Sequence, residues 1–474
     1  MVMGDLTQET EVLVIGGGPG GYAAAFRAAD LGLEVTIVDE EARPGGTCLF
    51  RGCIPSKTLL FATELMYDAG RADHMGLKFN RPEIDLASLR AWKDRVIDKL
   101  AGGLVTLSNR RNVQLVQARA CFESSDRVRL QGSEISRFRF RHAILASGSR
   151  PANLPGVEFR PGGRVMDSSG ALELAEIPER LLVVGGGYVG LELGSVYASL
   201  GSRVTLVESS ARLLPGADRD LASPLVRRIN ESFEAVHTGT RVKSIEERQD
   251  RVEVTLEGPV GPPQQGFDRV LVAIGRRPST EGLGLEKTGV RLDPRGFVVV
   301  DEQQRTADDR ILAIGDVVGG AMLAHKAMRE GRVAAEVIAR KPSTFDVRAI
   351  PAVVFTDPQI AWCGLTEEQA QQGNRAVKVA RFPWSASGRA ATMDATEGLT
   401  KVIFDAETQR VLGVGIVGRG AGEMIAEGVL AVEMGAQAED VALSMHPHPT
   451  LSETEGEAAE AFLGSATHIL ASKR

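Results

Sequence analysis

The chain has 474 residues, a length that suggests about three domains. Hydrophobic residues make up 43% and charged residues 25%, which is ordinary for a folded soluble protein and excludes disorder as the dominant state. With 55 basic against 62 acidic residues, a net charge of −7 and only 5% aromatic residues, the composition argues against a nucleic-acid partner.

Neither a membrane segment nor a targeting segment is expected. No stretch approaches the ~20 apolar residues that a membrane helix needs, and the polar N-terminus, Met1–Thr10, has no basic region followed by an apolar one. Four cysteines are too few to cross-link a chain of this length. We therefore expect a cytoplasmic protein, in which Cys121 and Cys363 are inert buried residues.

The first recognisable unit has the pattern strand, G-x-G-x-x-G, helix, strand and acid. Its parts are a strand at Glu11–Ile15, the glycines Gly16, Gly18 and Gly21, a helix at Tyr22–Leu31, a strand at Val35–Val38 and the acid Asp39. Glycines in this pattern allow a tight turn and close backbone approach, and the helix N-terminus holds a pyrophosphate. The acid accepts hydrogen bonds from a ribose hydroxyl.

The same unit recurs 169 residues later. Its parts are a strand at Leu181–Val184, the glycines Gly185, Gly187 and Gly190, a helix that ends near Leu200, a strand at Val204–Val207 and the acid Glu208. One such glycine pattern alone could be an ordinary tight turn. Two copies with the same internal spacing predict an α/β protein with two Rossmann-like domains, each binding a dinucleotide.

A third segment indicates which dinucleotide each unit binds. The strand Arg310–Ile314 ends in Gly315 and Asp316, and a helix is expected to begin near Leu323–Lys326. Asp316 is either a ligand of a sugar-alcohol chain or a simple turn residue, and the helix N-terminus can face a flavin ring. We therefore assign FAD to the first unit. NAD is favoured over NADP in the second, because Glu208 repels a 2′-phosphate, although Arg212 lies close by in sequence.

Cys48 and Cys53 form the candidate redox pair. In an ideal helix residues five apart are separated by about 7.5 Å along the axis, more than a disulfide tolerates, so a bridge requires a distorted turn. Gly52 supplies backbone freedom there, and Pro55 fits the first turn of a helix. A strained, accessible bridge suits a catalytic dithiol. The alternative is a pair of reduced structural cysteines; zinc is disfavoured because no second cysteine pair exists.

Two further residues are candidates for tuning this pair. Lys57 lies four residues after Cys53, so both would project from one helix face, and its ammonium would sit beside the flavin. An exposed surface lysine is the alternative. Glu192 could pair with Lys57, or it could only interact with the dipole of its own helix.

The candidate acid/base is His448, with Glu453 to orient it. Pro447 and Pro449 hinder helix formation, so His448 should stand on a rigid loop, and a histidine titrates near neutral pH. Glu453 could instead only close a capping box with Thr450. A metal site is disfavoured because no third ligand follows these histidines.

Together these segments carry a family resemblance. The chain resembles the flavin-dependent pyridine nucleotide–disulfide oxidoreductases over nearly its full length, and among them most of all those that oxidise dihydrolipoyl groups. The segments that match are Gly46–Lys57, Gly187–Gly194, Ala313–Val318, Pro383–Ala390 and His446–Glu453.

The resemblance implies a domain organisation and a site. The expected domains are an FAD-binding domain (1–149), an NAD-binding domain (150–277), a central domain that completes the FAD site (278–347) and a C-terminal α+β dimerisation domain (348–474). The expected catalytic residues are Cys48, Cys53, His448, Glu453, Lys57 and Glu192. The cofactor-binding set adds Ser147, Gly148, Ala324 and Gly275 to the residues above, and no metal ligand is expected.

The resemblance also implies a reaction and its partners. We expect an FAD-dependent oxidoreductase that oxidises a dithiol, a protein-bound dihydrolipoyl group, and reduces NAD⁺. It would act as a homodimer in which His448 of one subunit serves the cysteine pair of the other. No lipoyl-bearing segment is recognised, so the group would come from the acyltransferase of a 2-oxo acid dehydrogenase complex or from the glycine cleavage system.

Some positions depart from the family's usual pattern, and alternatives follow from related enzymes. Phe50 and Arg51 replace a small polar and an aliphatic residue, and Arg51 is expected to lower the thiol pKa values.

Two related enzymes are the alternatives. A glutathione reductase would carry cations after the second Rossmann strand, and a mercuric-ion reductase would carry a C-terminal cysteine pair. Glu208 and Ala471–Arg474 argue against these. A non-catalytic flavoprotein scaffold is disfavoured because every reacting group is present.

Overall fold

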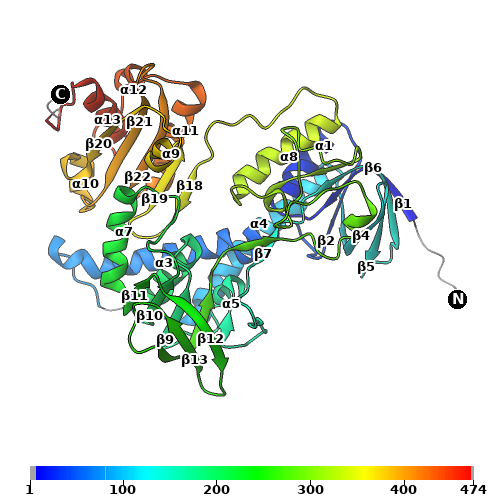
Figure 1. The fold of residues 1–474 in the computed structure, drawn as a ribbon, viewed down its shortest axis with the longest axis horizontal. Coiled ribbons are helices and arrows are strands. Elements are labelled where there is room, and N and C mark those ends of the chain that lie inside the picture. The colour runs from blue at the N-terminus through cyan, green and yellow to red at the C-terminus, as the bar shows by residue number, and fades with distance from the viewer. Residues whose placement is uncertain (1–6, 81, 471–474) are drawn as a thin grey trace.

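The computed structural model describes residues 7–80 and 82–470. Figure 1 shows three bodies: an N-terminal sheet with its helices, a second sheet formed by the middle of the chain, and a C-terminal sheet of yellow to orange strands with orange to red helices beside it. The first sheet has seven strands, and the second and third have five each. This confirms the predicted α/β fold with two dinucleotide-binding units and a C-terminal α+β domain.

The first unit contains the N-terminal sheet. Its elements are β1 (Thr7–Ile15), α1 (Pro19–Asp30), β2 (Val35–Asp39), α2 (Gly46–Arg51), α3 (Cys53–Arg71), η1 (Ala72–Met75), α4 (Leu86–Arg110), β3 (Gln114–Gln117), β4 (Arg119–Ser124), β5 (Arg127–Gln131) and β6 (Arg137–Leu145). Strands β3, β2, β1 and β6 run parallel, and β4 and β5 add an antiparallel edge. The central strand β1 is apolar at consecutive positions because both of its faces are covered.

A later segment returns to complete this unit. It consists of η2 (Leu285–Lys287), β17 (Ile311–Ala313), η3 (Gly315–Val318) and α8 (Ala324–Ile338). Strand β17 pairs in parallel with β6, and α8 packs along α1. The two helices approach closely at Gly331, where an added Cβ would lie 2.5 Å from the Gly20 carbonyl oxygen.

The second unit contains the parallel sheet of order β11-β10-β9-β15-β8. Its elements are β8 (Val165–Met166), α5 (Ser168–Glu173), β9 (Arg180–Val184), α6 (Tyr188–Leu200), β10 (Arg203–Glu208), α7 (Arg219–Ser232), β11 (Ala235–Thr238), β12 (Arg241–Glu247), β13 (Val252–Glu257), β14 (Gln264–Phe267) and β15 (Arg269–Val272). Strands β12 to β14 form a separate antiparallel ribbon. The helix predicted to end near Leu200 is α6.

Two short strands connect the units. Strand β7 (Ser149–Pro151) leads out of the first unit, β16 (Arg276–Pro278) leads back, and the two pair antiparallel. The boundaries predicted at 149/150 and 277/278 fall within these paired strands. The limits of the four predicted domains remain predictions.

The C-terminal domain is an antiparallel sheet of order β18-β19-β22-β21-β20 with helices packed on it. Its elements are β18 (Ala352–Val354), β19 (Ile360–Gly364), α9 (Glu367–Gln372), β20 (Val377–Pro383), η4 (Trp384–Ala386), α10 (Gly388–Thr392), β21 (Leu399–Asp405), β22 (Val411–Val417), α11 (Ala421–Met434), α12 (Ala438–Leu443) and α13 (Glu453–Leu463). Trp384 is fully buried in its core, and its indole nitrogen donates to Thr400 Oγ1 at 2.9 Å.

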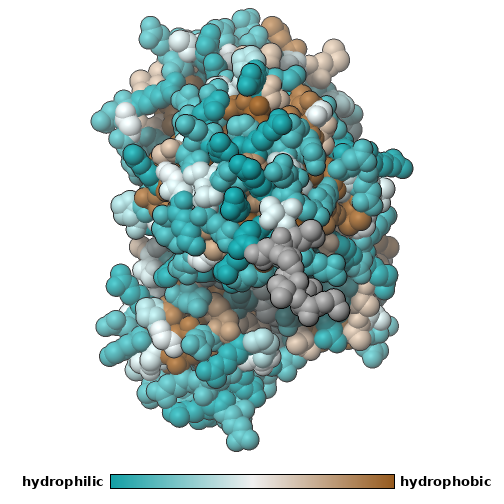
Figure 2. Space-filling model, turned by 90° about the vertical axis from the view of Figure 1, so that its right-hand side faces the viewer, coloured by the Kyte–Doolittle hydropathy of each residue, from teal (hydrophilic) through white to brown (hydrophobic). Residues whose placement is uncertain are grey.

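The outer face of the first unit is mainly polar. Figure 2, which looks at the right-hand side of Figure 1 where β4 to β6 lie, shows mostly hydrophilic residues with scattered apolar ones. Within residues 7–80 and 82–470, no helix is both long and apolar enough to cross a membrane.

Candidate active site

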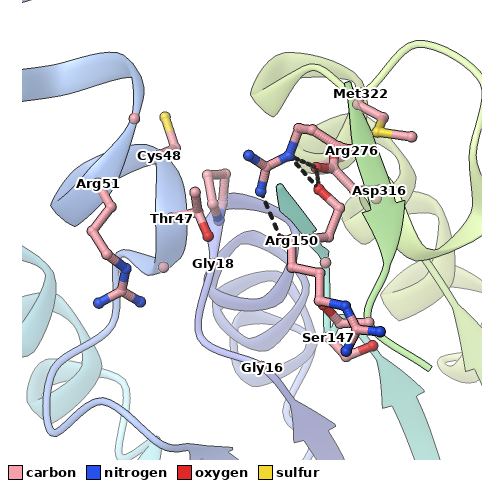
Figure 3. Close-up of a pocket in the computed structure, with 18 of the residues that line it drawn as sticks. Gly16, Gly18, Thr47, Cys48, Arg51, Ser147, Arg150, Arg276, Asp316 and Met322 are labelled. Atoms are coloured by element: carbon pink, nitrogen blue, oxygen red, sulfur yellow. Dashed lines mark hydrogen bonds and ion pairs between the residues drawn. The ribbon is translucent and has the colours of Figure 1, made fainter. Parts of the chain in front are cut away.

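One cavity of about 640 Å³ lies between the first unit, α8 and the start of α6. Eleven of the predicted site residues line it, and Figure 3 shows several of them around the opening. They are Gly16, Gly18, Asp39, Cys48, Cys53, Lys57, Ser147, Gly148, Glu192, Asp316 and Ala324. The cavity therefore joins the first glycine-rich loop to the cysteine pair.

The first loop needs its glycines for steric reasons. Gly16 has a φ of +106°, and an added Cβ would lie 2.2 Å from the Ala146 carbonyl oxygen. A Cβ at Gly21 would lie 1.8 Å from the Gly16 carbonyl oxygen. Gly18 is the N-cap of α1 and is open toward the cavity. A pyrophosphate can therefore approach the N-terminus of α1 closely.

Asp39 stands at the end of β2 beside this loop. Its carboxylate accepts the backbone N–H of Gly17 and, at 2.7 Å, that of Glu41. Burial raises the pKa of Asp39 above its ordinary value, and the two backbone hydrogen bonds oppose this. Its position on the cavity wall suits a ribose-binding acid.

The opposite wall carries Asp316 and an unsatisfied hydroxyl. Asp316 accepts a hydrogen bond from Ser149 Oγ, which itself accepts one from Arg276 Nε at 2.6 Å (dashed in Figure 3). Ser147 Oγ is buried without a hydrogen-bond partner among the described residues. Because buried polar groups are normally hydrogen-bonded, a buried hydroxyl without a partner on a cavity wall indicates that a bound ligand supplies one. The wall therefore fits FAD. Ala324 lies at the start of α8, which begins where the sequence predicts a helix start.

The second glycine-rich loop repeats the geometry of the first. Gly185 has a φ of +112°, and a Cβ there would lie 2.4 Å from the Ala273 carbonyl oxygen; a Cβ at Gly190 would lie 2.1 Å from that of Gly185. Gly187 has nothing within 4 Å of such a Cβ. This loop therefore also leaves room for a pyrophosphate.

Two more predicted residues lie on that second unit. Glu208 accepts the backbone N–H of Gly186 at 2.7 Å and that of Ser210 at 2.6 Å. Burial would raise the pKa of Glu208, but these hydrogen bonds hold it below its ordinary value, so the carboxylate is charged. Gly275, with a φ of +121°, follows β15 at the same sheet edge. Neither residue lines the FAD cavity.

The cysteine pair lies where one helix is interrupted. Helix α2 ends at Arg51, α3 begins at Cys53, and Gly52 between them has φ −151° and ψ −113°. A Cβ at Gly52 would lie 2.9 Å from the Thr47 carbonyl oxygen. This distorted turn is the one that the sequence predicts. Both cysteines are free thiols, and each shifts the pKa of the other.

The two thiols differ in acidity. The hydrogen bond from Cys48 and the nearby Lys57 ammonium lower the pKa of Cys53 to about 7, although burial opposes them. The hydrogen bond to Cys53, followed by burial, raises the pKa of Cys48 far above the ordinary range. The Lys57 ammonium therefore favours a thiolate at Cys53 in the reduced pair.

Lys57 is held by a buried acid. Its Nζ donates to Glu192 Oε2 at 2.7 Å and lies 4.7 Å from the centre of the Phe355 ring. Glu192 is 2% exposed, and its other oxygen accepts the backbone N–H of Phe355 at 2.9 Å. The ion pair proposed from sequence is therefore present, and it links α3 to α6 beside the thiols.

Arg51 is not among the strongest influences on the thiol pKa values, which does not favour the sequence-based expectation. Its guanidinium forms an ion pair with Glu41 and points away from Cys48 in Figure 3. The charged groups that act most strongly on the thiols are Lys57 and Glu192. The reason is the direction of its side chain. Arg51 is the last residue of α2, and its side chain extends toward the loop after β2, where Glu41 lies.

This arrangement predicts opposite results for two substitutions. Lys57→Met should raise the pKa of Cys53 toward the range of a free thiol, because an opposing charge is lost. Arg51→Val should leave it unchanged. The rate of alkylation of the reduced enzyme, followed against pH, measures both values. A rise in Arg51→Val, or none in Lys57→Met, would contradict the assignment of Lys57 as the tuning cation.

His448 lies in the loop between α12 and α13, as predicted. Its Nδ1 is 2.8 Å from Glu453 Oε1, while Glu453 Oε2 accepts the backbone N–H of Thr450 at 2.7 Å. Glu453 therefore orients the ring and also holds the Thr450 backbone, while the N-cap of α13 is Ser452, so the predicted capping box with Thr450 does not form. His446 is tied to Glu427 at 2.7 Å, which raises the pKa of His446 and agrees with a structural role.

The structure does not bring His448 to the cysteine pair of its own chain. His448 and Glu453 do not line the cavity, and the His448 side chain is 72% exposed. Its Nε2 edge is thus free to meet another molecule.

Sequence reasoning missed three residues of this site. Arg276 and Ser149 orient Asp316, and the Phe355 backbone fixes Glu192. An arginine directly after Gly275 at a strand end was a visible hint for Arg276. No sequence pattern marks Ser149 or Phe355, because their roles depend on contacts between distant segments.

The fold and the cavity define an oxidoreductase that binds two dinucleotides and carries a redox pair of cysteines. Residues 10–331 match the family described as pyridine nucleotide-disulphide oxidoreductase, and residues 350–459 match its dimerisation domain. The chain belongs to the pyridine nucleotide-disulphide oxidoreductase family. FAD and NAD are its cofactors, which confirms the prediction.

Known relatives cover nearly the whole chain. It is 46% identical over 464 residues to the dihydrolipoyl dehydrogenase of Vibrio parahaemolyticus (97% of each chain) and 49% identical over 463 residues to that of Thermus scotoductus (97% of this chain, 99% of the relative). Among solved structures, LpdA of Mycobacterium tuberculosis superposes with a TM-score of 0.88 at 28% identity (96% and 99% covered). The HOCl-induced flavoprotein disulfide reductase RclA of Escherichia coli gives 0.83 at 28% (95% and 99%).

The match to the dimerisation domain supports a homodimer. The surface of that domain agrees, since it exposes large apolar side chains on and after α11: Leu430, Met434, Leu443 and Met445, the last of them 98% exposed. Several large apolar side chains exposed on one domain are typical of a protein–protein contact.

Proposed function

We propose that the protein is a dihydrolipoyl dehydrogenase, which oxidises a protein-bound dihydrolipoyl group to lipoyl and reduces NAD⁺ to NADH. The observation that carries this proposal is the Cys48–Cys53 pair on the cavity wall, with the Lys57–Glu192 ion pair beside it. The names of the relatives at 46% and 49% identity support the substrate class.

The exchange steps use the cysteines in defined roles. One thiolate of the substrate attacks Cys48 Sγ of the oxidised pair, the S–S bond breaks, and Cys53 leaves as a thiolate. The second substrate sulfur then attacks the mixed disulfide, which closes the lipoyl ring and returns the electron pair to Cys48. The low pKa of Cys53 suits a leaving thiolate. Bound FAD, which the residues lining the cavity would hold beside the cysteine pair, would supply the two-electron chemistry that links the dithiol to NAD⁺.

The remaining residues move or hold charge. Each substrate thiol must lose a proton before attack, and the partner subunit's His448 is the proposed base, oriented by the partner's Glu453. Lys57 stabilises negative charge at Cys53, and Glu192 positions Lys57. Sharing of the site between subunits is supported by the exposure of His448 and its distance in the fold from the cavity.

The proposed cofactor-binding residues divide between the two units. For FAD they are Gly16, Gly18, Gly21, Asp39, Lys57, Ser147, Gly148, Asp316 and Ala324. For NAD they are Gly185, Gly187, Gly190, Glu208 and Gly275. The charged Glu208 at the ribose position favours NAD over NADP.

The proposed partner is the lipoyl-bearing acyltransferase of a 2-oxo acid dehydrogenase complex, or the lipoyl protein of glycine cleavage. A cytoplasmic location remains a prediction from composition and cysteine content. The alternative is a disulfide reductase for glutathione or mercuric ion. Glu208 argues against the first. Ala471–Arg474, on which the sequence-based expectation about the second rests, lie outside the described residues.

The deciding experiment is a nicotinamide-reduction assay with dihydrolipoamide, run with NAD⁺ and with NADP⁺ on the FAD-loaded protein. The proposal expects rapid NADH formation and little activity with NADP⁺. Absence of turnover despite bound FAD and a reducible cysteine pair would exclude this substrate. Oxidised glutathione and mercuric ion, tested with NADH and NADPH, would then be the next acceptors.

A further inference from the structure

The loop that follows β10 forms one edge of the second dinucleotide site. This loop, residues 209–218, lies directly against the second glycine-rich loop: the Leu214 N–H donates to the Gly186 carbonyl at 3.0 Å, and a Cβ at Gly186 would lie 2.5 Å from Leu213 Cδ2. Glu208, immediately before the loop, accepts the Gly186 N–H. Groups on this loop would therefore lie beside the ribose of an adenosine bound at the second glycine-rich loop.

Arg212 is the single basic residue of this loop. A 2′-phosphate is recognised by a cation beside the ribose, so Arg212 is the group that could bind one. Its guanidinium is instead paired with the carboxylate of Glu368, which belongs to α9 of the C-terminal domain. The charge that would attract a phosphate is thus neutralised from another domain.

The position of Glu368 is fixed by its surroundings. Helix α9 begins against Asp218, whose carboxylate accepts the backbone N–H groups of Glu367 and Glu368 at 3.0 and 3.2 Å. Asp218 is buried and bound to Lys401 Nζ at 2.6 Å. Glu368 is therefore carried by a rigid junction between the two domains, although its own side chain is 43% exposed.

We propose that Glu368 is a positioning residue for cofactor specificity: it holds Arg212 in an ion pair and so disfavours dinucleotides that carry a 2′-phosphate. Discrimination then has two parts. Glu208 repels the phosphate directly, and Glu368 removes the cation that would compensate for this repulsion. The inference rests on the proposed NAD site in the second unit.

The test measures binding rather than turnover. The FAD-loaded dimer is titrated calorimetrically with adenosine 2′,5′-bisphosphate and with 5′-AMP at constant ionic strength. Glu368→Gln should tighten the bisphosphate by about three- to tenfold, the range of one charge-assisted hydrogen bond at a partly exposed site. Binding of 5′-AMP should stay unchanged.

The matched control is Glu179→Gln. Glu179 forms a comparable exposed pair with Arg203, at 2.7 Å, but Arg203 begins β10 and so lies at the amino ends of the strands. Cofactors bind outside the carboxyl ends of such strands. This variant should alter neither dissociation constant.

Arg212 supplies the second half of the test. Arg212→Gln alone should leave bisphosphate binding unchanged, because the cation is already neutralised. The double variant Arg212→Gln/Glu368→Gln should lose the tighter bisphosphate binding that Glu368→Gln shows. The proposal is overturned if Glu368→Gln gives no gain, if the gain survives in the double variant, or if Arg212→Gln alone weakens the bisphosphate. If no variant binds 5′-AMP or NAD⁺, the proposed function fails and the inference with it.

Discussion

Replacing His448 with glutamine is expected to lower turnover with dihydrolipoamide and NAD⁺ by about 10²- to 10⁴-fold, the range for loss of a general base. Glutamine keeps a polar side chain of similar reach but cannot take the proton of the substrate thiol. Glu453 orients His448 at 2.8 Å, so Glu453→Gln should give a smaller loss in the same step.

The half-reactions separate this effect from a general defect. His448 does not line the cavity, so reduction of bound FAD by NADH should keep its rate in His448→Gln, whereas reduction by dihydrolipoamide should fall. His468→Gln is the matched control, because His468 is an exposed histidine paired with Glu457 in the same domain. Equal losses in both half-reactions, or a loss in the control, would contradict the role of His448.

A mixed dimer tests whether the site is shared. Homodimers of Cys48→Ser and of His448→Gln should both be inactive. In a heterodimer of the two, one site combines an intact cysteine pair with the other subunit's intact histidine, while the second site lacks both. Shared sites therefore predict about half of the wild-type activity per dimer. If each subunit carried its own complete site, the heterodimer would be inactive.

Local patterns predicted the parts of the fold that depend on local sterics. The glycine spacing identified both dinucleotide loops because a Cβ at Gly16 or Gly185 would clash with a backbone oxygen of the neighbouring strand segment. The distorted turn at Gly52 followed from the distance that a disulfide permits. In these cases the constraint lies within a few residues or within one repeated unit.

Contacts between distant segments were not predictable in the same way. The direction of Arg51 depends on Glu41, and the state of Arg212 depends on Glu368, which is 156 residues away. Which of several nearby charges pairs with a given cation is decided by how whole units dock. The resemblance to a family supplied the role of His448, since its distance from the cysteines in one chain gives no hint of it.

Lys401 is the residue whose loss we expect to destabilise the protein most. Its side chain is 1% exposed in the middle of β21, and Nζ lies 2.6 to 2.8 Å from carboxylate oxygens of Asp218, Asp220 and Glu367. These three acids come from α7, the loop before it and α9, so the ammonium joins the second unit to the C-terminal domain. Lys401→Met should cost about 3–5 kcal/mol of unfolding free energy, because it leaves carboxylates buried without their cation.

The midpoint of urea unfolding of the FAD-loaded enzyme measures this cost. Lys378→Met is the control, since Lys378 is exposed on the adjacent strand β20. Adding Asp218→Asn and Glu367→Gln to Lys401→Met should recover part of the loss, because the unpaired charge is removed. A midpoint equal to that of the wild type, or no recovery in the triple variant, would show that the network does not stabilise the junction.

The stability that Lys401 contributes should depend on pH in one definite direction. Burial alone would raise the pKa of Asp220, but its bonds to Lys401 hold the pKa below the ordinary value. A lowered folded-state pKa contributes stability that is present above the unfolded value and is lost as the pH falls through the folded one. The stability gap between wild type and Lys401→Met should therefore be full at neutral pH and close under acid conditions. A gap that stayed the same from neutral pH into acid would mean that Lys401 stabilises the fold through packing of its alkyl chain rather than through these carboxylates. Glu368 would then lose the anchored junction on which its hold over Arg212 depends.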